Sequence, residues 1–106
     1  MKGWHISAAA NRASIAETGL RRDGGGWDAG FIWFFVDRPT AEKMAEGRAW
    51  GGFRGGNDVW GIDLSGLDVL PDPHPGWGDE RDEVARAVVV NVEPERLSLS
   101  PFGSFV

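Results

Sequence analysis

A chain of 106 residues can bury one hydrophobic core but not two, so we expect a single domain over residues 1–106. Hydrophobic residues make up 42% and charged residues 25%, which is typical of a globular protein and argues against wholesale disorder. The net charge of −5 makes a large nucleic-acid interface an unlikely function, because such an interface normally needs a basic face.

The composition also limits the cofactors and the location. The chain has no cysteine and two histidines, which excludes disulfides and thiolate metal sites and leaves little room for any other metal site. No apolar run approaches the roughly 20 residues of a membrane helix, and the N-terminus lacks the pattern of a signal peptide. We therefore expect a cytoplasmic protein with no metal and no membrane partner.

Charge is distributed unevenly along the chain. Residues 1–56 carry eight basic and six acidic groups, whereas residues 57–106 carry three basic and ten acidic groups. An anionic ligand would therefore be attracted to the first half of the sequence.

The first half predicts strands and helices in alternation. Residues 3–7 have a short strand pattern, and a helix over about 11–18 follows and ends at Gly19. The continuous apolar run 31–36 predicts a strand that is buried on both faces. A second helix is expected over about 38–46, with its apolar stripe packed on that strand.

The second half predicts mostly strands. Residues 48–57 are rich in glycine, aromatic residues and arginine, which suggests a loop that covers a ligand. The alternating pattern 59–64 predicts a strand with one buried face, and the apolar run 87–92 predicts a buried inner strand. Residues 97–105 suggest a short edge strand. Two helices near the N-terminus followed mainly by strands indicate an α+β fold with a mixed or antiparallel sheet.

An ordered set of residues in the first 45 positions carries a family resemblance. A strand with the pattern Trp4-His5-Ile6-Ser7 is followed by Asn11-Arg12, by a helix that ends in Gly19-Leu20, and by the aromatic strand 30–35. This set resembles the opening of ADP-ribosyltransferase-like proteins. That broad group includes the RNA 2′-phosphotransferases and the DarT-type toxins.

The resemblance implies a small split β-sheet that holds NAD, as a substrate, in a cleft. His5 would bond a ribose hydroxyl and Ser7 would meet the nicotinamide amide. Trp33 or Phe34 would stack on the nicotinamide ring, and Arg12 is a candidate partner of the pyrophosphate. The residue types suit these roles, since imidazole both donates and accepts, an aromatic face suits a flat cationic ring, and a guanidinium matches phosphate oxygens.

Cleavage of the nicotinamide–ribose bond would need a carboxylate, because positive charge develops on the ribose. The resemblance implies a glutamate at the final core strand, and Glu83 is the best candidate for it. Alignment on the downstream residues 92–97 brings Arg86 to that position instead. A transferase reaction would then lack its main charge stabiliser.

Each of these residues also has a structural interpretation. His5 could be a half-buried strand histidine bonded to the backbone. Trp33 and Phe34 point to opposite faces of a strand, so both could pack in a double-sided core. Glu83 belongs to the acidic segment 79–83, which could be a solvated turn.

Two functions follow from the resemblance. The first is a small NAD-binding domain that transfers ADP-ribose to an unknown macromolecular acceptor or hydrolyses NAD, with His5, Trp33 and Glu83 as catalytic residues. The alternative is a non-catalytic module that binds a nucleotide or a protein and keeps the fold without the catalytic glutamate. A purely structural domain is also compatible with the fold, because fold does not determine function.

Overall fold

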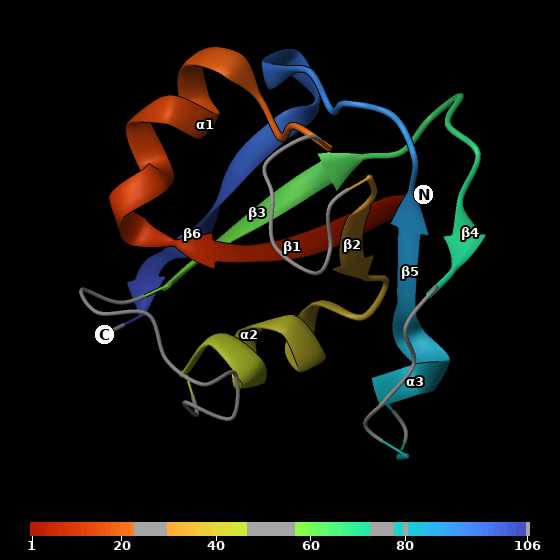
Figure 1. Ribbon diagram of the computed structural model, residues 1–106. Coiled ribbons are helices and arrows are strands. Elements are labelled where there is room, and N and C mark those ends of the chain that lie inside the picture. Colours follow the sequence, from red (N-terminus) through yellow and green to blue (C-terminus); the bar gives the residue numbers. More distant parts are fainter. Residues whose placement is uncertain (23–29, 47–56, 73–77, 80, 106) are drawn as a thin grey trace.

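The computed structural model describes residues 1–22, 30–46, 57–72, 78–79 and 81–105, and for residues 46 and 100–105 it describes the backbone alone. The segment 48–57, suggested above as a ligand-covering loop, therefore lies outside the described residues except for Asn57. A six-stranded antiparallel sheet and three short helices form an α+β fold in the described residues (Figure 1).

Both helices expected in the first half are confirmed. α1 spans Arg12–Thr18 and α2 spans Arg38–Glu46. α2 begins after Asp37, whose carboxylate accepts a hydrogen bond of 3.2 Å from the backbone N–H of Thr40, as an N-cap does. The remaining helical segments are a third α-helix and two 3-10 helices: α3 Arg81–Val84, η1 Ala9–Asn11 and η2 Pro94–Arg96.

The strands lie in the order β4-β5-β2-β1-β3-β6, and all neighbouring pairs are antiparallel. Their bounds are β1 Lys2–Ala8, β2 Ile32–Phe35, β3 Asn57–Asp63, β4 Leu70–Pro71, β5 Ala85–Val88 and β6 Leu97–Phe105. Every residue of β2 is buried, which confirms the double-sided strand expected from the apolar run. β6 is an edge strand, also as expected.

Two strand expectations need correction. The run 87–92 is not one buried strand, because β5 ends at Val88 and the next two valines are about 45% exposed. β3 is not one-sided, because all of its residues except Asp63 are buried. β3 lies between β1 and β6 and is covered on both faces, so its small and apolar residues all enter the core.

The core has two layers, one on each face of the sheet. On the α2 side, Ile6, Trp33, Phe35 and Val59 pack with the helix residues Ala41 and Met44. On the α1 side the main core residues are Ile15, Leu20, Ile32, Phe34, Trp60, Ile62, Val88 and Val92. Figure 1 shows the two helices on opposite sides of the strands. Because side chains alternate between the two faces of a strand, β2, β3 and β5 each contribute residues to both core layers.

The sheet is split between β1 and β2. β1 pairs with β3 along its whole length, from Lys2 opposite Asp63 to Ala8 opposite Asn57. β1 and β2, in contrast, share the single register pair Trp4 and Phe35. Figure 1 shows β2 and β5 at a steep angle to β1 and β3, so the two halves of the sheet separate beyond that pair.

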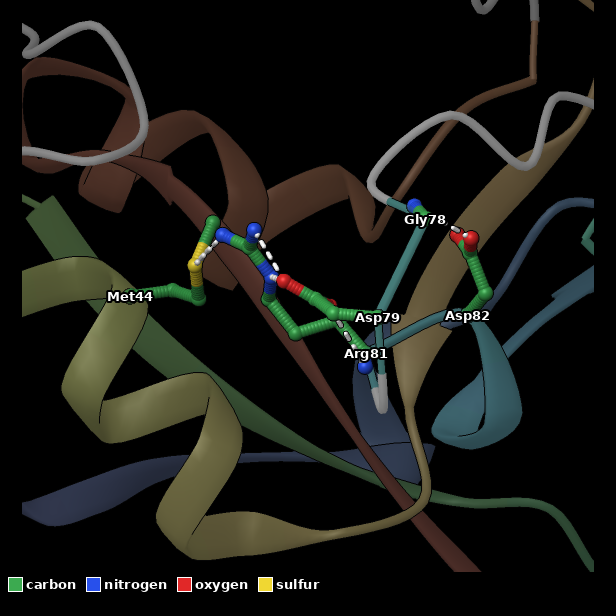
Figure 2. A network of polar contacts seen from close by, with 5 residues as sticks. All are labelled: Met44, Gly78, Asp79, Arg81 and Asp82. Carbon is green, nitrogen blue, oxygen red and sulfur yellow. Dashed lines mark hydrogen bonds and ion pairs between the residues drawn. The ribbon is translucent and has the colours of Figure 1, made fainter.

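A polar network joins α3 to α2, as Figure 2 shows. The Arg81 guanidinium donates to the Asp79 carboxylate at 2.6 Å and to the Met44 sulfur at 3.4 Å. The pKa of the Asp79 carboxyl lies below its ordinary value because the side chain and backbone of Arg81 donate to it. Asp82 accepts a hydrogen bond of 2.8 Å from the Gly78 backbone. The network therefore connects α3 to α2 through the contact of Arg81 with Met44.

Candidate functional site

A cavity of about 450 Å³ lies where β1 and β2 separate, on the α1 side of the sheet. His5 and Ser7 of β1 line it, as do Ile32, the first residue of β2, and Phe31 just before that strand. A volume of this size falls within the range of small-molecule sites, which is roughly 300–1,000 Å³. The split therefore provides a pocket in place of the missing β1–β2 pairing.

α1 forms one wall of the cavity. Asn11, Ser14 and Thr18 line it, together with the core residue Ile15. These positions are spaced by three or four residues, so their side chains share one face of the helix. The wall is therefore polar, although the Thr18 hydroxyl already donates to the carbonyl of Ser14 at 2.8 Å.

His5 is oriented by the backbone of β2. Its Nδ1 lies 2.6 Å from the carbonyl oxygen of Trp33, and a carbonyl can only accept, so Nδ1 carries the proton. Nε2 is then the acceptor of the neutral ring. The ring also lies 5.5 Å from the Trp33 ring in a tilted arrangement. His5 therefore bonds the backbone, as its structural interpretation expected, and it also lines the cavity.

Ser7 is a buried cavity residue with an unusual hydroxyl. The residue is 8% exposed, and its Oγ has no hydrogen-bond partner in the described part of the chain. Buried hydroxyls normally have a partner, because loss of hydration without a replacement hydrogen bond is unfavourable. A polar ligand in the cavity would supply that partner.

The rim of the cavity is cationic. Arg21 and Arg22, which follow the end of α1, both line it. The Arg22 backbone N–H donates to the side-chain oxygen of Asn91 at 2.9 Å, and the Arg22 guanidinium donates to the carbonyl of Val89. No aspartate or glutamate belongs to the cavity lining that the structure describes. The local field therefore favours an anionic ligand.

Arg12 does not line this cavity. Its guanidinium makes two hydrogen bonds, of 2.9 and 2.7 Å, with the carboxylate of Asp58 on β3. Asp58 is fully buried, and its carboxylate raises the pKa of Arg12 above its ordinary value. The proposed pyrophosphate role of Arg12 does not fit this geometry, because the guanidinium is already bonded to a carboxylate outside the cavity lining.

Trp33 and Phe34 both pack in the core, on opposite sides of the sheet. Phe34 is 0% exposed and Trp33 is 8% exposed, so neither presents a ring face to the cavity. Phe31, at the other end of the same apolar run, is among the described residues that line the cavity, and it also packs against the α2-side core.

The two candidates for the carboxylate position lie apart from the cavity. Glu83 is exposed on the short helix α3, outside the cavity lining. Arg86 lies on β5 opposite Phe34, and its guanidinium donates to the carbonyl of Ala85 at 2.7 Å. Because it shares the face of Phe34, Arg86 lies on the α1 side of the sheet, as the cavity does.

Sequence reasoning missed most of the lining. Ser14, Thr18 and Phe31 were not singled out as site residues, and Asn11 was noted only as part of the family resemblance. The helical spacing of Asn11, Ser14 and Thr18 was the signal that could have identified one polar face. Only the tertiary structure, which places β1 and β2 opposite that face, shows that the face lines a pocket.

In the described ranges, no group of three or more histidine, aspartate or glutamate side chains could hold a metal ion. No helix in the same ranges has the length and apolar character needed to cross a membrane. No known family model matches the chain, and no curated protein does. The cavity is therefore the main evidence for a function.

Proposed function

We propose that the chain is a nucleotide-binding module whose cavity takes NAD or an ADP-ribose-like fragment. The observation that carries this proposal is the lining of the split, which combines an oriented imidazole, several hydroxyl groups and two arginines without a carboxylate. Ribose hydroxyls and a pyrophosphate are the complementary ligand groups. The resemblance of the first 45 residues to ADP-ribosyltransferase-like proteins points to the same ligand.

The proposed contacts follow the chemistry of the lining. Arg21 and Arg22 would hold the pyrophosphate, and Nε2 of His5 would accept a hydrogen bond from a ribose hydroxyl. Ser7 would bond an amide or a further hydroxyl, which would satisfy its buried Oγ. Phe31 would form an apolar wall for a flat ring.

Substitution of His5 tests the ligand assignment. We expect His5→Ala to weaken binding of ADP-ribose by about 1 to 2 kcal/mol, the scale of one lost hydrogen bond. Calorimetry of the wild type and the variant measures this, and thermal unfolding checks that the variant remains folded. The assignment is wrong if the wild type binds no nucleotide at millimolar concentration, or if the folded variant binds as tightly as the wild type.

Binding without turnover is the form of this function that the geometry favours. The cavity lining that the structure describes contains no aspartate or glutamate, so no carboxylate there stabilises the positive charge that develops on the ribose. We therefore expect the wild type to release nicotinamide from NAD no faster than the uncatalysed background.

The carboxylate candidate gives the decisive variant for turnover. If nicotinamide is released and Glu83→Gln abolishes release while binding remains, the chain is an NAD-cleaving enzyme with Glu83 as its charge stabiliser. An unknown macromolecular acceptor or water would then take the ADP-ribose. Arg86→Ala is the matched control and should change release little in that case. We propose a cytoplasmic location for either function.

A further inference from the structure

The cavity rim contains an internal ion pair. Nη1 of Arg21 lies 3.2 Å from Oε1 of Glu93, with the two side chains 42% and 53% exposed. Arg21 lines the cavity and Glu93 does not. In the part of the chain that the structure describes, Glu93 is the one carboxylate paired with an arginine of the rim.

The backbone holds this pair in place. Leu20 and Val92, the preceding neighbours of Arg21 and Glu93, exchange two backbone hydrogen bonds of 2.8 Å each. The side chain of Asn91 also accepts from the Arg22 backbone. The carboxylate is therefore presented to Arg21 by a short antiparallel bridge.

We infer that Glu93 is an internal competitor that an anionic ligand must displace from Arg21. The inference rests on the proposed function only in assuming that anions enter the cavity. A guanidinium bonded to a carboxylate offers fewer donors to a phosphate, and the carboxylate repels the incoming charge. Exposed pairs of this kind are weak, so displacement lowers ligand affinity modestly and leaves binding possible.

The test uses inorganic pyrophosphate as the probe, in calorimetry at low ionic strength. Glu93→Gln is expected to tighten pyrophosphate binding about threefold, the scale of one exposed ion pair. The matched control is Glu95→Gln, which removes the same charge from an exposed position two residues further along. The control should leave the affinity nearly unchanged. Equal tightening in both variants would overturn the inference, because it would show a general effect of net charge.

A double-mutant cycle tests whether Glu93 acts through Arg21. In an Arg21→Gln background, Glu93→Gln is expected to give no further tightening. A threefold gain that persists without Arg21 would overturn the inference. Weaker binding in Glu93→Gln alone would overturn it as well, since Glu93 would then position Arg21 for the ligand.

ADP-ribose separates this inference from the proposed function. If pyrophosphate responds as expected but ADP-ribose binds no more tightly than pyrophosphate, the nucleotide assignment fails and the role of Glu93 stands. If neither the wild type nor Glu93→Gln binds pyrophosphate at millimolar concentration, the role of Glu93 fails.

Discussion

Replacement of Arg12 by alanine is expected to lower the free energy of unfolding substantially, because the buried Asp58 carboxylate would lose its partner, although the Arg12 side chain itself is 45% exposed. The Asp58 carboxylate is fully buried and accepts two hydrogen bonds from the Arg12 guanidinium. Without that partner the carboxylate would remain in the core uncompensated. Urea unfolding of the wild type and the variant measures the difference.

The same substitution at Arg21 is the matched control. Arg21 pairs with a carboxylate that is 53% exposed, so water can replace the lost contact. We expect Arg21→Ala to cost no more than about 1 kcal/mol. Equal costs for the two variants would contradict the explanation by the buried Asp58 carboxylate. Because Arg12 lies in the first turn of α1, its loss should also loosen the helical wall of the cavity.

Replacement of Gly19 by alanine is the second substitution with a large expected effect. Gly19 has φ 79° and ψ −168°, a conformation that is essentially restricted to glycine. A Cβ at this position would lie 2.1 Å from the carbonyl oxygen of Val92, and that oxygen already accepts a backbone hydrogen bond from Leu20. We expect a loss of about 3 kcal/mol or more, from backbone strain and steric overlap together.

Substitution of Gly66 distinguishes backbone strain from steric overlap. It also has a positive φ, of 78°, but a Cβ built there meets no atom within 4 Å. Gly66→Ala should therefore show only the conformational cost, about 1 kcal/mol. A comparable loss in both variants, measured by urea unfolding, would show that the approach of Val92 to Gly19 is unimportant. Since Gly19 lines the cavity, its variant should also weaken ligand binding.

The candidate site was only partly predictable. His5 and Ser7, which one short strand pattern singles out, both line the cavity. The contact of Arg12 with Asp58 was not predictable in this way, because the two residues are 46 positions apart. Phe31 was missed because a continuous aromatic run does not show which ring lies at the open end of the split.

Local sequence by itself determined the two helices of the first half and the buried strand β2. The Asp37 cap and Gly19 bound the two helices, and the apolar run 31–36 identified a strand buried on both faces. These features depend on neighbours within a few residues, so a pattern along the chain contains them.

Only the tertiary structure decided where the cavity lies and what surrounds it. The loss of pairing between β1 and β2 after Trp4 and Phe35 opens the sheet, and α1 closes that opening with its polar face. Asp58 and Glu93 reach their arginines from distant parts of the chain. Such contacts depend on which strand edges meet and which helix face covers them. Residue patterns of period 2 or 3.6 do not specify these contacts between elements. Such patterns give only the direction of each side chain relative to its own strand or helix.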